Sequence, residues 1–90
     1  MLMTKLTVTV SRGLQARNTV LFVSKAYAFK SNVILLKNDA SADGKDIMKV
    51  MDLHVKDDDI ITLAVNGSDE EAAMDALKKS LVISSTADNE

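Results

Sequence analysis

The residues best suited to chemistry lie in the turn Gly13-Leu14-Gln15-Ala16-Arg17. Gly13 suits a tight turn, and Gln15 stands where the N-cap of a following helix is expected. The first amides of that helix, those of Ala16 and Arg17, have no partner within the helix. With the guanidinium of Arg17 and the positive end of the helix dipole, these amides form a geometry that binds anions. The turn therefore predicts an anion site at Ala16 and Arg17, although a simple helix start explains the same residues.

A second cluster begins at Asp46, which precedes a short apolar stretch. Aspartate is among the best helix N-caps, so capping alone accounts for this residue. Ile47, Met48 and Met51 follow at a spacing that brings them to one side of a short helix. Such a trio most often belongs to a core, but methionine also suits surfaces that accept several partners.

The remaining candidate is His54, the only histidine of a chain that contains no cysteine. Without cysteine there is no disulfide or thiol catalysis, and one histidine alone does not make a zinc site. His54 follows the short helix, where a solvent-facing histidine is favoured by the helix dipole. The sequence shows no paired carboxylates, nucleophile–base pair or glycine-rich phosphate loop. We therefore expect neither an enzyme nor a cofactor or metal.

Length and composition predict the class of protein to which these residues belong. Ninety residues of 9.7 kDa, 47% hydrophobic and 27% charged, predict one ordinary globular domain. All thirteen acidic residues lie after residue 38, and such a charge asymmetry can mark a nucleic-acid-binding arm. A single small domain, however, folds both halves into one surface. Three aromatic residues are also too few for an RNA-stacking sheet. The longest apolar runs are far shorter than the roughly twenty residues of a membrane span, and no signal peptide is visible. A cytoplasmic protein that binds neither nucleic acid nor membrane is expected.

The elements that must position these residues follow from hydrophobic periodicity. Strands are predicted over residues 5–10, 32–37 and 60–65, with a short, weak strand over 40–42. Helices are predicted over 16–29, over 46–53 and after Ser68, where Ser68 and Glu71 match a capping box. The predicted core positions of the first and last helices are Val20, Leu21, Phe22, Val23 and Tyr27, and Ala73, Leu77 and Leu81.

The predicted order is β-α-β-β-α-β-α, which indicates an α+β fold. Its helices cover one face of a small, mostly antiparallel sheet, as in a split β-α-β sandwich. One domain is expected over residues 1–83, followed by a frayed polar tail over 84–90.

Two motifs resemble one known family. Residues 13–17, Gly-Leu-Gln-Ala-Arg, resemble the Gly-(Leu/Ile)-His-Ala-Arg-Pro signature of HPr, the histidine phosphocarrier of the bacterial sugar phosphotransferase system. Residues 45–53, Lys-Asp-Ile-Met-Lys-Val-Met-Asp-Leu, are similar to the Lys-Ser-Ile-Met-Gly-Val-Met-Ser-Leu segment of HPr from Gram-positive bacteria. The resemblance spans nearly the whole chain, and the predicted order of strands and helices agrees with that of the family. It implies an open-faced β-sandwich with a four-stranded antiparallel sheet.

The chain departs from this family at the residues that carry phosphate. Gln15 stands where the family has the histidine that accepts a phosphoryl group from enzyme I, and a carboxamide is neither basic nor nucleophilic. Asn18 replaces the family's proline, whose ring presets the first helical turn. A glutamine at this position resembles the Crh branch, HPr-like proteins of catabolite repression in bacilli, which keep only a serine that a kinase phosphorylates. Asp46 replaces that serine. It either caps the helix or acts as a permanent mimic of phosphoserine that carries less charge.

The resemblance implies a non-catalytic, Crh-like regulatory module of carbon catabolite control. Its expected partners are phosphotransferase-system proteins (enzyme I-like and permease domains) and a repressor of the catabolite-control type. Contacts are expected at Arg17, Ile47, Met48 and Met51, because the family presents this apolar helix to its partners. Two alternatives stay open: a divergent phosphocarrier with another acceptor such as His54, and a dimeric small-molecule sensor with a ferredoxin-like core.

Overall fold

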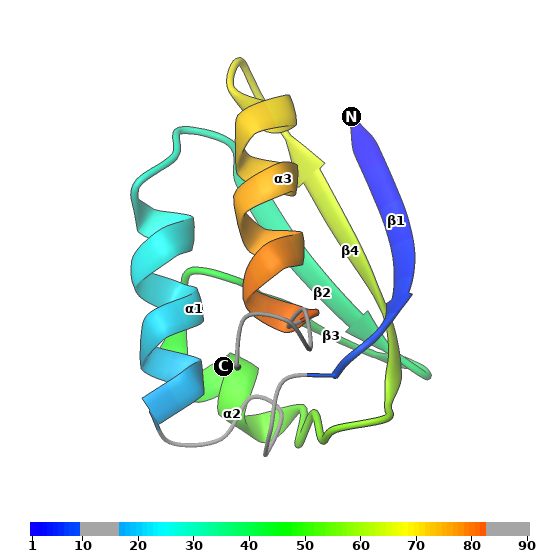
Figure 1. Ribbon diagram of the computed structural model, residues 1–90. Helices are drawn as coiled ribbons and strands as arrows, with labels where there is room; N and C mark the ends of the chain where they lie inside the picture. The colour runs from blue at the N-terminus through cyan, green and yellow to red at the C-terminus, as the bar shows by residue number, and fades with distance from the viewer. Residues whose placement is uncertain (10–16, 83–90) are drawn as a thin grey trace, which may run out of the picture.

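The computed structural model describes residues 1–9 and 17–82 and contains four strands and three helices in the predicted order (Figure 1). The elements are β1 (Leu2–Thr7), α1 (Arg17–Tyr27), β2 (Asn32–Lys37), β3 (Ala40–Asp43), α2 (Ile47–Asp52), β4 (Ile60–Asn66) and α3 (Glu70–Leu81). Within this part of the chain, no helix combines the length and apolarity that crossing a membrane requires. The predicted domain end at residue 83 and the tail at 84–90 lie outside the described residues.

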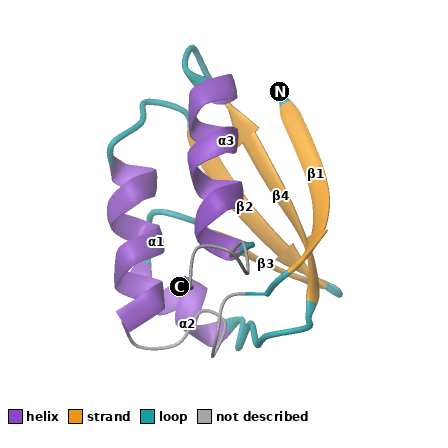
Figure 2. Ribbon diagram, in the orientation of Figure 1, coloured by secondary structure: helices purple, strands orange, loops and turns teal. Residues whose placement is uncertain are grey.

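The four strands form one sheet in the order β1-β4-β2-β3, in which every neighbouring pair is antiparallel. Because β1 and β2 both pair with β4, they run parallel to each other with β4 between them. This arrangement is the predicted split β-α-β unit. All three helices lie on one side of the sheet, so the expected open-faced α+β sandwich is confirmed (Figure 2).

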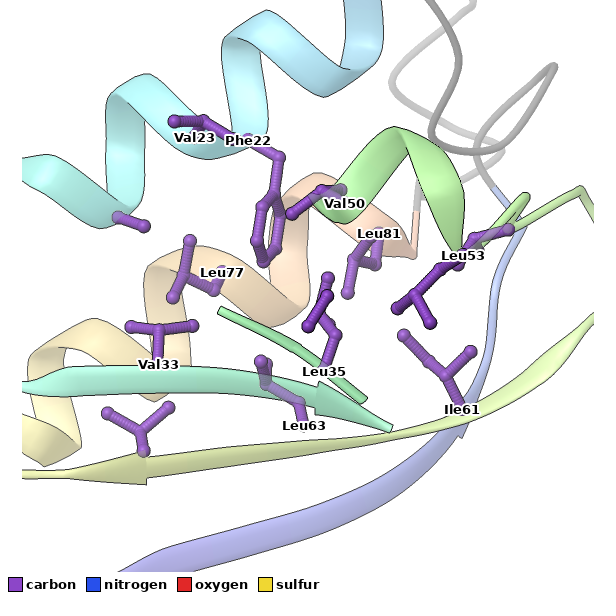
Figure 3. Close-up of a cluster of buried hydrophobic side chains, with 14 of the residues drawn as sticks. Phe22, Val23, Val33, Leu35, Val50, Leu53, Ile61, Leu63, Leu77 and Leu81 are labelled. Atoms are coloured by element: carbon purple, nitrogen blue, oxygen red, sulfur yellow. The ribbon is translucent and has the colours of Figure 1, made fainter. Parts of the chain in front are cut away.

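The core fills the space between the helices and one face of the sheet. Phe22 of α1 is completely buried and points toward the sheet between Val50 of α2 and Leu77 of α3 (Figure 3). The other fully buried large side chains are Val8, Val33, Leu35, Val55, Ile61, Leu63, Val65 and Leu81. At the edge of this core, a Cβ on Gly44 would lie 2.5 Å from Cγ1 of Val33, so only glycine lets the chain pass so close.

The predicted core face of α1 is wrong in part. Val20, Leu21 and Tyr27 are exposed, and Tyr27 keeps 68% of its accessible surface. The buried positions of this helix are instead Thr19, Phe22, Val23 and Ala26. Both sets fit a helical period and share Phe22 and Val23. The buried set adds Thr19 and Ala26, which are smaller than the exposed residues, on the helix that contacts α3. The helix is also shorter than the predicted span of residues 16–29.

The predicted capping box at Ser68 and Glu71 is also wrong. The N-cap of α3 is Asp69, and the helix begins at Glu70. The carboxylate of Glu70 accepts a hydrogen bond from the amide of Gly67 at 3.1 Å, so the glutamate half of a capping box lies one residue earlier than predicted. The predicted core positions of α3 are confirmed, since Ala73, Leu77 and Leu81 are all buried.

Asp69 occupies the N-cap position of α3, but its side chain makes no hydrogen bond to the helix because its carboxylate is bonded to another part of the chain. It accepts hydrogen bonds from the amides of Lys30 and Ser31 at 2.8 and 3.0 Å, and from the hydroxyl of Ser31 at 2.5 Å. These bonds join the turn before α3 to the turn between α1 and β2.

The strand boundaries differ from prediction mainly at β1. This strand begins at Leu2 and ends at Thr7, whereas the alternation predicts residues 5–10. It starts early because Leu2 pairs with Val65, near the far end of β4. Val10 lies outside the described residues, and the other strands end within one residue of the prediction.

Candidate functional site

The site is built around the start of α2, at Asp46. This residue has extended backbone angles, and its Oδ1 accepts a hydrogen bond from the amide of Lys49 at 3.2 Å. Its own amide donates to the carbonyl oxygen of Asp43 at 3.0 Å, which holds the turn that precedes the helix. Asp46 therefore caps α2 as the sequence predicts.

The side chains of α2 lie mostly on the surface. Ile47, Met48 and Met51 are 40%, 67% and 42% exposed, and Val50 is the buried residue of this helix. A helix of six residues turns fewer than two full turns, so only one position faces the core. The structure contradicts a core role for Ile47, Met48 and Met51 and leaves them as an apolar surface.

A shallow groove of about 540 Å³ lies between α1 and the beginning of α2. Tyr27 of α1 and Met48 of α2 both line it, and Lys45 and Asp46 contribute its polar part. Nζ of Lys45 also donates to the carbonyl oxygen of Phe29 at 2.8 Å, which ties the segment before α2 to the end of α1. The groove is therefore lined from both helices.

Sequence reasoning missed the exposed apolar side chains of α1, of which Tyr27 lines the groove. Val20, Leu21 and Tyr27 are exposed large hydrophobic residues that periodicity assigns to the core. The signal that finds them is the competing stripe at residues 19, 22, 23 and 26, which fits the same 3.6-residue period. A helix whose sequence contains two such stripes can bury one of them in the core and leave the other exposed.

Of the predicted anion site, the structure describes only Arg17. Arg17 is the first residue of α1 and is exposed, whereas Gln15 and Ala16 lie outside the described residues. The first turn of α1 contains no acidic side chain that would offset the positive end of its dipole. This end of α1 lies beside α2, so Arg17 shares one region of the molecule with the apolar surface (Figure 1).

The C-terminal end of α2 is held by Lys37 of β2. Nζ of Lys37 donates to the carbonyl oxygens of Leu53 and His54 at 3.2 and 2.6 Å, and forms an ion pair of 3.0 Å with Asp59. The amide of Lys56, with help from Lys37, holds the pKa of Asp59 below its ordinary value. These contacts fix α2 at the end opposite Asp46.

His54 is placed as a helix terminator with an exposed side chain. Its φ of 53° lies in the left-handed region, and its amide donates to the carbonyl oxygen of Met51 at 3.0 Å. This geometry is typical of the residue that ends a helix. Within the described residues, no three side chains of His, Cys, Asp or Glu lie close enough to hold a metal ion.

Comparison with known proteins identifies relatives over almost the whole chain. Residues 2–82 match the family model described as PTS HPr component phosphorylation site. The HPr-like protein Crh of Halalkalibacterium halodurans is 40% identical over 70 residues, which are 78% of this chain and 83% of that protein. The HPr-like protein Crh of Bacillus subtilis is 39% identical over 77 residues, 86% of this chain and 91% of that protein. The crystal structure of phosphocarrier protein HPr from Bacillus anthracis superposes with a TM-score of 0.87 at 32% identity and covers 90% of this chain and 96% of that one.

Proposed function

This chain belongs to the HPr family of the sugar phosphotransferase system, and from that premise we propose that it is a non-catalytic, Crh-like regulatory module. It acts in the cytoplasm by binding proteins of the phosphotransferase system and a repressor of the catabolite-control type. It does so without carrying a phosphoryl group between partners.

The observation that carries this proposal is the exposure of the apolar side chains of α2. Ile47, Met48 and Met51 share the surface of a helix whose two ends are fixed by hydrogen bonds. A rigid, contiguous apolar patch of this kind is typical of a protein interface. Arg17 at the neighbouring end of α1 supplies a positive charge for an acidic group of the partner.

The residues at the two phosphorylation positions of the family support a role without phosphoryl transfer. Gln15 stands at the position of the phosphoacceptor histidine, and its carboxamide nitrogen is not nucleophilic. Asp46 stands at the position of the regulatory serine and offers no hydroxyl to a serine kinase. Phosphorylation at these two positions therefore does not regulate partner binding by this chain.

The two alternative functions receive less support. The divergent phosphocarrier would use His54, whose backbone ends α2 and whose side chain is exposed. The small-molecule sensor would use a ferredoxin-like core, whereas the chain matches the HPr family from residue 2 to residue 82.

The decisive experiment is incubation with phosphoenolpyruvate and enzyme I, followed by mass spectrometry of the intact chain. We expect no phosphoadduct on the natural chain. The Gln15→His variant is expected to accept phosphate at least slowly, because Arg17 remains to bind the phosphoryl oxygens. Asn18 in place of proline leaves this recovery partial.

The matched control is Gln15→Asn, which changes the same position without adding a nucleophile and is expected to stay unmodified. A phosphoadduct on the natural chain would contradict the proposal. If that adduct disappears in a His54→Gln variant, the chain is a divergent phosphocarrier that uses His54.

A further inference from the structure

The methionine side chains of this protein differ sharply in exposure. Met48 and Met51 of α2 are 67% and 42% exposed, whereas Met74 of α3 is 6% exposed and belongs to the core cluster. The other two, Met1 and Met3, are exposed at the start of the chain. Because the chain contains no cysteine, methionine provides all of its side-chain sulfur, and oxidation of that sulfur depends on its exposure. Two of the exposed sulfurs therefore lie on α2, within the apolar surface.

Met48 and Met51 lie on one side of α2, because residues three apart are neighbours on a helix. Met48 also lines the shallow groove of about 540 Å³ between α1 and α2. This groove is far larger than hydrogen peroxide, which is little bigger than a water molecule. Both side chains are therefore accessible to a peroxide from solvent, whereas the core shields Met74.

We propose that Met48 and Met51 form a reversible oxidation site that controls the binding of protein partners, an inference that rests on the proposed function. The oxidant is hydrogen peroxide or an organic hydroperoxide. The thioether sulfur attacks the terminal oxygen of the peroxide, so that the O–O bond breaks, an S–O bond forms and the proton of the transferred oxygen passes to the leaving group. Sulfur loses two electrons and becomes a sulfoxide, and the peroxide is reduced to water or to an alcohol. A dithiol reductant reverses the oxidation and yields the thioether, water and a disulfide.

Oxidation changes the chemistry of the partner surface, which consists of Ile47, Met48 and Met51. A thioether is apolar and adapts its shape to different partners, whereas a sulfoxide is polar and carries an oxygen that accepts hydrogen bonds. An apolar partner that covers this oxygen offers it no donor, and burial of an acceptor without a donor opposes binding. Two sulfoxides remove most of the apolar surface of α2, since Ile47 is its remaining exposed apolar side chain.

The fold tolerates this change, because α2 is held by contacts that involve neither methionine side chain. Val50 is the residue of α2 that the core buries. Oδ1 of Asp46 caps the first turn, and Nζ of Lys37 holds the carbonyl oxygens that follow the last turn. Oxidation is therefore expected to weaken binding and to leave folding intact. Since the phosphorylation positions of the family hold Gln15 and Asp46, oxidation of sulfur supplies a reversible change at a surface that phosphorylation does not regulate.

Peptide mapping by mass spectrometry locates the oxidised methionines after the full chain has reacted with dilute hydrogen peroxide. We expect Met48 to be oxidised at least about tenfold faster than Met74, and Met51 at a rate between the two, because the rate follows the exposure of the sulfur. Met3 serves as the exposed reference outside the partner surface. In guanidinium chloride, which unfolds the chain, all of these methionines are expected to react at similar rates. A folded chain whose Met48 and Met51 react as slowly as Met74 would overturn the proposal.

The affinity of the oxidised chain measures the effect on the partner surface. The natural chain is treated with peroxide, freed of the reagent, and titrated with enzyme I and with a catabolite-control repressor. We expect the dissociation constant to rise about tenfold or more, while the thermal melt stays close to that of the untreated chain. Methionine sulfoxide reductases of both stereochemical specificities, supplied with a dithiol, are expected to restore the affinity. An affinity that oxidation leaves unchanged would overturn the inference and leave the proposed function intact.

Matched variants assign the effect to α2. In Met48→Leu/Met51→Leu both side chains stay apolar and similar in volume, so this chain is expected to bind like the natural one and to keep its affinity after peroxide. Met3→Leu keeps both sulfurs of α2 and is expected to lose affinity as the natural chain does. Loss of affinity in the peroxide-treated double variant, or a large fall of the melting temperature when the natural chain is oxidised, would overturn the proposal. A natural chain that binds neither protein before oxidation would overturn the proposed function and with it the control of binding, and the peptide map would still decide where the chain is oxidised.

Discussion

Met48 and Leu53 are both large apolar residues of the α2 region, but the structure gives them opposite environments. Met48 lies on the surface, and Leu53 lies in the core cluster beside Val55 and Ile61. We expect Met48→Ala and Met51→Ala to lower the free energy of unfolding by less than about 1 kcal/mol, because little buried surface is lost. Binding to an enzyme I or a catabolite-control repressor should weaken by about 1–2 kcal/mol for each, if these side chains anchor the interface.

Thermal melts and isothermal titration calorimetry separate these two effects. The control is Leu53→Ala, for which we expect a stability loss of about 2–5 kcal/mol. Melting temperatures of the methionine variants that fall as far as that of Leu53→Ala would show that Met48 and Met51 support the core.

Asp46 combines a structural role with a charge at the same surface. Asp46→Asn keeps the cap of α2, since asparagine caps as well as aspartate, and removes only the charge. If this carboxylate stands for phosphoserine, the variant should bind a catabolite-control repressor more weakly by up to about 1 kcal/mol, and the difference should shrink as salt is added. Equal affinities of the natural chain and the variant at low and moderate salt would mean that capping is the whole role.

At the scale of elements, the carboxylate of Asp69 joins two turns that the chain separates by 38 residues. The hydroxyl of Ser31 and then the amide of Lys30 hold the pKa of Asp69 below its ordinary value of 3.8. A carboxylate with a lowered pKa in the folded state stabilises the protein above its unfolded pKa, and this stabilisation is lost as the pH falls through the folded value. Part of the stability of this fold therefore disappears in acid, below about pH 4.

We expect Asp69→Ala to lower the urea midpoint at neutral pH and to reduce its dependence on pH in the acid range. Asp59 and Glu70 also have lowered pKa values, so some acid dependence remains in the variant. Urea unfolding from about pH 2 to pH 7 measures both effects. Asp75→Ala removes an exposed carboxylate from α3 and serves as the control. If the acid dependence of Asp69→Ala equals that of the natural chain, the contact with Ser31 does not set it.

At the scale of the whole molecule, the sheet separates the side covered by the helices, which holds the core, from an open side. Its covered face supports the core, on which α1 and α2 lie with the proposed partner surface (Figure 1).

The sequence by itself determined the order of the elements and most of their boundaries. Strand alternation, the apolar repeat of α3 and the cap at Asp46 depend on neighbours within a few residues, and the structure confirms each of them. The same local patterns carried the family resemblance at residues 13–17 and 45–53. The anion-binding role of Ala16 and Arg17, the lack of phosphate acceptance at Gln15 and the regulatory role of Asp46 stay predictions.

Only the tertiary structure decided which face of α1 is buried and which residue occupies the N-cap position of α3. The two stripes of α1 share Phe22 and Val23 and are equally regular, and packing against α3 and the sheet selects the one that adds Thr19 and Ala26. Asp69 binds Ser31 because the fold brings the two turns together, and this contact prevails over the local pattern of Ser68 and Glu71. Both outcomes depend on contacts between residues far apart in the chain, which a local pattern does not contain.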